Sequence, residues 1–194
     1  MFKRILLSGV LAGIAVFLWE GVAHMVLPLG EAGFRAVPDE AAFAASLKTQ
    51  FQEGGLYLFP APESRPGMTS AEKQKAMDAA MKQARIGPSG LLLIHPEGEE
   101  TLSPRQFGTQ IFADILVMLI AAWVLSKTAF VRGYPARVAF VAALALFPIL
   151  EVHVPYWNWY GFPATFILAA SVVHAGGFLV GGLVLAKMVT GARG

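Results

Sequence analysis

Four long apolar stretches divide the chain, and a more polar stretch, residues 29–103, separates the first two. The apolar stretches cover residues 1–28, 104–127, 136–153 and 163–187. Each approaches the ~20 residues that an α-helix needs to cross the ~30 Å hydrocarbon core of a bilayer. The pattern predicts an all-α membrane domain of four transmembrane helices, with an insert between the first and the second.

The ends of these stretches carry further signals. Lys3 and Arg4 precede the first stretch, as in a secretory signal peptide. This stretch is longer than a typical signal-peptide core and no small-x-small cleavage site follows it, so we expect a retained signal anchor. The second helix should begin at Ser103-Pro104, a capping residue before a first-turn proline. Pro148 predicts a kink in the third helix.

Basic residues in the short connections predict the orientation. They lie before the first helix, between the second and third, and after the fourth: Lys3, Arg4, Lys127, Arg132, Arg137, Lys187 and Arg193. The connection between the third and fourth helices has none. By the positive-inside rule both termini are cytoplasmic and residues 29–103 are extracytoplasmic. We therefore expect a multi-pass protein of the bacterial cytoplasmic (inner) membrane, with the lipid bilayer around it and Tyr156, Trp157, Trp159 and Tyr160 in its outer aromatic belt.

The insert reads as a small α+β domain. Residues 41–52 and 71–85 are predicted helices, and each precedes a short apolar strand at residues 55–60 and 90–98. The expected order is therefore α-β-α-β. Because a two-stranded sheet is marginal by itself, we expect it to lean on the two helices, or alternatively to accept a partner strand at its open edge.

Composition narrows the classes of function. Hydrophobic residues make up 56% of the chain and charged residues 14%, against roughly 25% charged residues in soluble domains. The net charge of +2 is too small to indicate nucleic-acid binding. The chain has no cysteine, which excludes disulfides, thiolate metal sites and cysteine catalysis. Nucleotide-binding, hydrolase and zinc-protease motifs are also missing, so the sequence predicts no catalytic residues.

A few polar residues interrupt the apolar stretches: Glu20, His24, Asp114, Glu151, His153 and His174. A lone carboxylate in hydrocarbon costs at least a few kcal/mol, so it needs a proton, water, a histidine or a metal ion as partner. At ~100° per residue, Glu20 and His24 share a helix face with Gly9 and Gly13. His174 likewise shares a face with Gly181, with Gly177 at its edge. Both glycine pairs have the G-x-x-x-G spacing that allows close helix contact.

We therefore expect the first and fourth helices to pack together and to bring Glu20, His24 and His174 near each other. Asp114, which shares a face with Gln110, could join from the second helix. Three interpretations stay open. The residues form a hydrogen-bonded polar knot, a metal or haem site, or a proton or quinol pathway. As metal ligands the sequence favours Glu20, His24 and His174 before Asp114, Glu151 and His153.

Residues 19–31, WEGVAHMVLPLGE, resemble a group of uncharacterised bacterial four-span inner-membrane proteins, in which an H-M-x-L-P-L-G-E segment follows the first helix. The resemblance implies no activity. It makes the end of the first helix a candidate for a specific role.

Together these features favour a non-catalytic accessory subunit of a larger cytoplasmic-membrane complex, with respiratory or photosynthetic electron transport as the expected setting and the other subunits as partners. The alternative is a stand-alone membrane redox protein that binds a metal ion or haem with the Glu/His residues named above.

Overall fold

The computed structural model describes residues 2–189, so Met1 and Arg193 lie outside the described residues. The chain forms two compact units. Of the described residues, one unit comprises 2–34 together with 100–189, and the other comprises 35–99.

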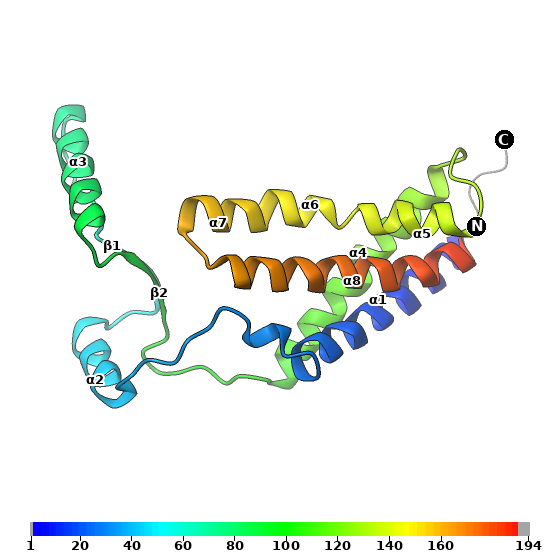
Figure 1. Cartoon of the computed structure of the whole chain (residues 1–194), viewed down its shortest axis with the longest axis horizontal. Coiled ribbons are helices and arrows are strands. Elements are labelled where there is room, and N and C mark those ends of the chain that lie inside the picture. The colour runs from blue at the N-terminus through cyan, green and yellow to red at the C-terminus, as the bar shows by residue number, and fades with distance from the viewer. Residues whose placement is uncertain (1, 190–194) are drawn as a thin grey trace. The chain divides into compact units, whose positions relative to one another are not determined.

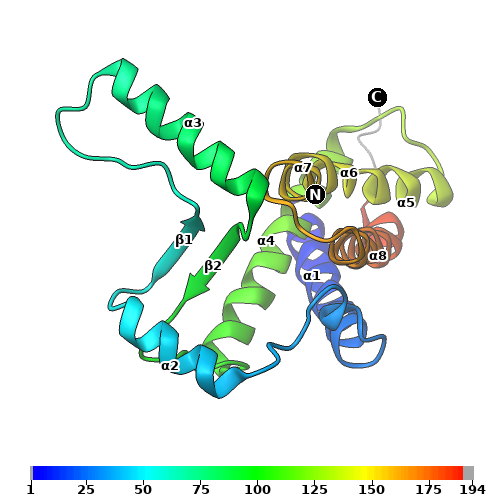
Figure 2. The same cartoon turned by 60° about the vertical axis from the view of Figure 1, so that its left-hand side comes forward.

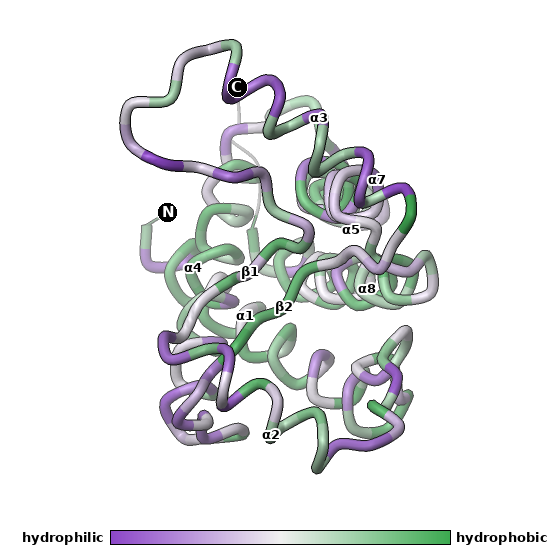
Figure 3. Tube along the Cα trace, turned by 90° about the vertical axis from the view of Figure 1, so that its left-hand side faces the viewer, coloured by the Kyte–Doolittle hydropathy of each residue, from purple (hydrophilic) through white to green (hydrophobic). Residues whose placement is uncertain are grey.

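The first unit is a bundle of four long helical stretches (Figure 1): α1 (Phe2–Met25), α4 (Pro104–Lys127), the composite stretch Tyr134–Tyr160 and α8 (Ala164–Met188). They contain 24, 24, 27 and 25 residues and are apolar enough to cross a membrane. Figure 3 shows their predominantly hydrophobic character along the trace. The prediction of a helical, multi-pass membrane protein is confirmed at this level.

The start of α4 follows from its first residues. The Ser103 hydroxyl accepts a hydrogen bond from the Gln106 backbone N–H at 3.3 Å, and the Gln106 side chain accepts one from the Ser103 N–H at 3.0 Å. This reciprocal pair satisfies two of the amide groups that a helix leaves unpaired at its start. Pro104, which has no N–H, fits the first helical position.

The third helical stretch is longer than the predicted residues 136–153. It consists of α5 (Tyr134–Ala143), α6 (Leu146–Pro148), a π-helical turn η2 (Ile149–His153) and α7 (Val154–Tyr160). Before Pro148 the backbone hydrogen bonds span three residues instead of four, since the Phe147 N–H donates to the Leu144 carbonyl at 3.1 Å. Pro148 lacks an N–H, and after it Val154 N–H reaches back five residues to the Ile149 carbonyl. The proline therefore changes the hydrogen-bond pattern without ending the helix, and the aromatic residues of α7 are helical.

Helix α1 packs against both α4 and α8, and α8 also packs against α5. The predicted contact between the first and fourth helices is thus confirmed. Gly9 and Gly13, however, face α4: a Cβ atom at Gly9 would lie 2.9 Å from the Leu119 Cα, and one at Gly13 would lie 2.6 Å from the Ile115 nitrogen. The glycine pair of α1 therefore lets the α4 backbone approach.

The glycines of α8 serve two other neighbours. Gly177 and Gly181 face Val16 of α1, and Gly181 also meets the Met118 sulfur. Gly182 packs on α5, where its added Cβ would lie 3.2 Å from the Val138 carbonyl oxygen.

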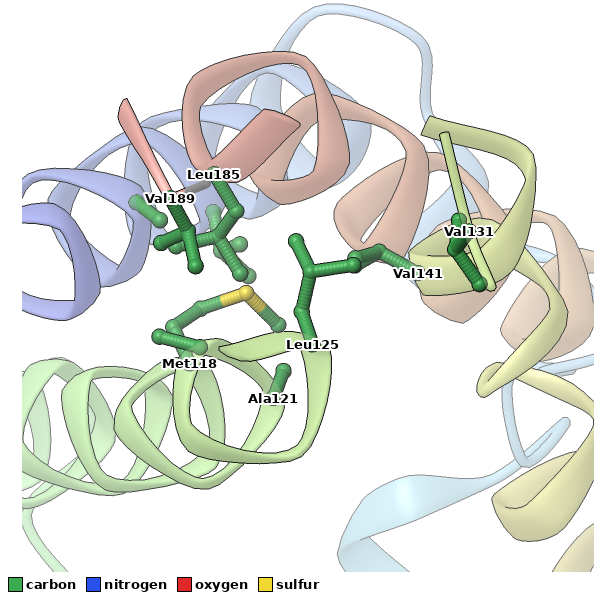
Figure 4. Packing of buried hydrophobic residues seen from close by; sticks show 10 residues of the cluster. Met118, Ala121, Leu125, Val131, Val141, Leu185 and Val189 are labelled. Carbon is green, nitrogen blue, oxygen red and sulfur yellow. The ribbon is translucent and has the colours of Figure 1, made fainter. Parts of the chain in front are cut away.

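The buried apolar core of the bundle includes Met118, Leu125 and Leu185 (Figure 4). Its members come from the second half of α4, the middle of α1, α5, the end of α8 with the residue that follows it, and the connection between α4 and α5: Ala12, Val16, Met118, Ala121, Ala122, Leu125, Val131, Val141, Leu185 and Val189. The other half of α4, toward its first residue, carries the polar side chains.

The second unit has the predicted α-β-α-β order: α2 (Glu40–Gln50), β1 (Gly55–Phe59), α3 (Ser70–Ile86) and β2 (Gly90–Ile94). The strands pair antiparallel, with Leu56 opposite Leu93 (Figure 2). Neither helix packs closely on this sheet. Ile94 is the one buried residue among residues 35–99, all of which are described. The sheet therefore does not lean on its own helices, and the alternative expectation, a partner at the sheet, stays a prediction.

Candidate functional site

One side-chain amide connects α1 and α4. The Gln110 Nε2 group donates to Glu20 Oε2 at 2.9 Å and to Asp114 Oδ1 at 3.0 Å. Both N–H bonds of the amide are therefore used, each on a different carboxyl group. Gln110 and Asp114 lie one turn apart on α4, as their helical spacing predicts.

Asp114 is the most enclosed carboxyl group of the bundle's described residues. Its exposed fraction is 7%. Its second oxygen, Oδ2, is buried and has no hydrogen-bond partner within residues 2–189. A buried polar atom without a partner costs ~1–3 kcal/mol, so this atom calls for an explanation.

Helix packing places His174 of α8 in the same part of the bundle as Asp114 of α4. Met118, one turn after Asp114, touches Gly181, and α4 and α8 run in the same direction (Figure 1). One turn back from that contact on each helix, Asp114 comes level with Gly177, and His174 lies almost one further turn back on α8.

The hydrogen bond of His174 fixes its tautomer. Its Nδ1 lies 3.0 Å from the Ala170 carbonyl oxygen. Because a carbonyl oxygen accepts and cannot donate, Nδ1 carries the proton. In the neutral ring Nε2 is then an unprotonated acceptor.

His153 reaches the same place from the π-helical turn of the third stretch. It is 6% exposed, and its Nδ1 lies 3.0 Å from the Ser171 hydroxyl oxygen. Its ring centroid is 4.8 Å from that of His174, at an interplanar angle of 74°. Wide helical turns of this kind are frequent at functional sites. We use the name polar cluster for the six residues Glu20, Gln110, Asp114, His153, Ser171 and His174.

Sequence reasoning missed Ser171 and the Trp19 contact. The Trp19 Nε1–H donates to the Val173 carbonyl at 2.9 Å and so ties α1 to α8 beside the cluster. The spacing of Ser171 three residues before His174 places both on one helix face and could have indicated a shared role.

Two sequence candidates lie outside the polar cluster. His24 is exposed, and its Nδ1 bonds the Glu20 backbone carbonyl at 2.9 Å while its ring lies against Gly30 of η1 (Leu29–Glu31). Glu151 is exposed on the third helical stretch. The structure thus brings Glu20, Asp114 and His174 into one region, whereas the His24 ring turns to its own helix backbone and to η1.

In the bundle, Glu20 and Asp114 both accept a hydrogen bond from the uncharged Gln110 side chain. Within residues 2–189 the two ion pairs are Arg65–Glu63 and His95–Glu99, both in the second unit. The same residues contain no group of three or more His, Asp or Glu side chains that could hold a metal ion. A metal or haem site at Glu20, His24 and His174 stays a prediction.

A second candidate surface lies on the sheet of the second unit. Leu56, Leu58 and Leu93 are 68%, 55% and 67% exposed, and Leu91 lies beside them on the same side of the sheet. We call these four residues the leucine face. The opposite side carries the buried Ile94 and Tyr57, whose ring meets that of Phe51 at a centroid distance of 4.5 Å.

Comparisons with protein-family models, with curated proteins and with solved structures find no match to this chain. The resemblance of residues 19–31 to a group of membrane proteins stays a prediction. The polar cluster and the leucine face are therefore the two candidate sites of the protein.

Proposed function

We propose that this protein is a non-catalytic subunit of a larger membrane complex and that its leucine face binds a partner subunit. The observation that carries the proposal is the exposure of three leucine side chains on a two-stranded sheet. Contiguous exposed apolar side chains mark interaction surfaces. A sheet of two strands also needs further packing to be stable.

The form of the sheet indicates the chemistry of the partner. Among the described residues, each of the two strands has one unpaired edge. An extended segment of another protein can add a strand to such an edge. Every second side chain of that segment would lie on the same side of the sheet as the leucine face and would extend it. A partner with an apolar, extended segment therefore fits this surface.

The proposal also specifies the side of the membrane on which the partner binds. The basic residues at the helix ends support an orientation with both termini in the cytoplasm of a bacterium and residues 35–99 outside the inner membrane. The setting that the sequence favours is a complex of respiratory or photosynthetic electron transport. The lack of recognisable catalytic motifs is compatible with an accessory role.

Extraction of the tagged full chain from its native membrane in mild detergent tests the proposal. We expect a partner at fixed stoichiometry, linked by cross-linking to the sheet, and its loss in Leu56→Ser and Leu93→Ser. Lys75→Ser, an exposed change on α3, is the matched control and should retain the partner. The proposal fails if the native protein migrates alone, or if both leucine variants recover the partner as fully as the control.

A further inference from the structure

The proposed function leaves the side-chain bridge between α1 and α4 without a role. The Gln110 Nε2 group donates one N–H to Glu20 Oε2 at 2.9 Å and the other to Asp114 Oδ1 at 3.0 Å. Because both carboxyl oxygens bond the same nitrogen, the two acids are held close together. Two carboxylates at such short range repel each other, and a proton on one of them removes the repulsion.

Burial and hydrogen bonding identify the atom that takes up this proton. Asp114 is 7% exposed, and its Oδ2 is buried without a partner among the described residues. Glu20, by contrast, is half-buried. A negative charge on Asp114 would leave Oδ2 without solvent or a donor, whereas a hydrogen on Oδ2 makes the group neutral and keeps Oδ1 as the acceptor for Gln110. The arrangement therefore favours the neutral acid at Asp114.

We propose that Glu20, Gln110 and Asp114 form a binding site for one proton, which is taken up at Asp114 Oδ2 and holds α1 against α4. Uptake forms an O–H bond between a proton from water and an electron pair of the carboxylate oxygen, and release returns the proton to water. With the proton bound, Gln110 bridges at most one charged group. Without it, one neutral amide lies between two carboxylates, whose repulsion separates the two helices near the site.

The glycine contact limits this separation to one end of the helix pair. A Cβ atom at Gly13 would lie 2.6 Å from the Ile115 nitrogen, so the two backbones are in direct contact there. Glu20 lies beyond Gly13, toward the end of α1, and Gln110 lies before Ile115, toward the start of α4. The contact between α1 and α4 therefore has one part fixed by backbone packing and another that depends on the proton.

Other titratable groups in this part of the bundle make no hydrogen bond to either carboxyl group. The three histidines bond backbone carbonyls or a serine hydroxyl instead, and the arginine and the glutamate are exposed. Within residues 2–189 no ion pair includes Glu20 or Asp114. The groups are His24 of α1, Arg105 of α4, Glu151 and His153 of the third stretch, and His174 of α8.

Infrared difference spectroscopy between acidic and alkaline pH tests the bound proton, with the full chain in lipid nanodiscs. We expect a component of the carboxylic-acid C=O band that Asp114→Asn removes and that Glu20→Gln retains, because the proton is on Asp114. Glu151→Gln, a change at an exposed acid of the third stretch, is the matched control and should retain the component. The proposal is overturned if no component depends on Asp114, or if Glu20→Gln removes the same component.

A distance measurement tests the separation of the helices, because the chain contains no cysteine to compete for spin labels. Labels at Gly21→Cys and Gly108→Cys lie beside the site, and a Cβ atom added at either glycine meets nothing within 4 Å. The distance between them should increase as rising pH removes the Asp114 band. Leu7→Cys with Trp123→Cys, at positions that are 55% and 56% exposed, forms the control pair beyond the glycine contact and should keep its distance.

Two further variants connect the movement to the carboxyl pair. Asp114→Asn and Glu20→Gln each leave at most one charge at the site, so in both the labels should stay at the short distance at every pH. Glu20→Gln supplies this readout by itself if Asp114→Asn folds poorly. The proposal is overturned if the labels separate in these variants as in the native chain, if the native distance does not change with pH, or if the control pair moves equally. It is also overturned if His174→Asn alone abolishes the separation.

Discussion

Helices α1 and α4 of the bundle differ from α2 and α3 of residues 35–99 in how much of each helix is buried against the rest of the chain. Each of the first pair has six buried residues, and neither of the second pair has any. Yet α3 has a complete capping box between Thr69 and Glu72. Local signals are therefore enough to define where a helix begins, whereas long-range packing decides what fixes it in place.

The largest effect is expected where two backbones of the bundle meet. Gly13→Leu would place a side chain against the Ile115 backbone, with its Cβ 2.6 Å from the Ile115 nitrogen. Since backbone atoms cannot rotate away, we expect a loss of at least ~3 kcal/mol in the free energy of unfolding. Denaturation of the protein in detergent micelles, followed by circular dichroism, measures it.

Gly21→Ala on the same helix is the control, because nothing lies within 4 Å of its added Cβ. It should leave stability unchanged or raise it by ~0.5–1 kcal/mol. Similar losses for the two variants would show that glycine packing does not hold α1 to α4.

The next effect is expected in the apolar core. Met118 is 1% exposed and touches Gly181, so Met118→Ala should create a cavity and cost ~2–5 kcal/mol of unfolding free energy. Leu116→Ala on the same helix, where the side chain is 47% exposed, should cost much less. The same denaturation experiment compares the two, and an equal loss would argue against the core of Figure 4.

A smaller effect on stability is expected in the second unit, where α3 has a capping box but no buried residues. Thr69→Ala removes the hydroxyl that accepts the Glu72 N–H at 3.3 Å and should cost ~1 kcal/mol of local helix stability. Hydrogen exchange of the first-turn amides of α3 should accelerate while that of α1 and α4 remains unchanged. Faster exchange throughout the chain would show that the two units unfold together.

The pH dependence of the same cap follows from Glu72. Hydrogen bonds from the Thr69 backbone N–H and hydroxyl lower the pKa of this carboxyl group below its ordinary value of 4.5. The carboxylate form therefore stabilises the folded helix start fully above pH 4.5. This contribution declines as the pH falls through the lowered pKa. Exchange rates at Thr69 and Glu72 should rise in that acidic range, and Glu72→Gln should remove the dependence.

The smallest effect on stability is expected at the leucine face. Leu56 is 68% exposed, so Leu56→Ser removes little buried surface within the chain and should change the unfolding free energy of the isolated protein by less than ~0.5 kcal/mol. A large loss would show that the leucine face is covered within the chain, which would remove the basis for a partner there.

The sequence allowed much of the fold to be predicted, because the relevant signals are local. The length of the apolar stretches identified the four long helices, and Ser103-Pro104 marked the start of α4. The end of the third stretch could not be predicted, since Pro148 and the aromatic residues after it are equally typical of a loop. There the hydrogen bonds of a π-helical turn continue the helix.

The candidate site divides in the same way. Helical spacing placed Gln110 beside Asp114, and the structure adds the bond between them. The partners across helices could not be derived from spacing. His153 meets His174 because the wide turn of η2 brings it to Ser171, and His24 instead bonds its own helix backbone.

The sequence by itself determined which residues share a helix face, because 3.6 residues per turn is a local property of the chain. Only the tertiary structure decided which helix faces pack against each other. Gly9 and Gly13 could have served any neighbour, and they pack on α4 because its backbone fits against them at Leu119 and Ile115. That contact brings Gln110 to Glu20 across the two helices. Shape complementarity between surfaces far apart in the chain therefore assembled the polar cluster, because helical spacing alone does not determine which side chains meet across helices.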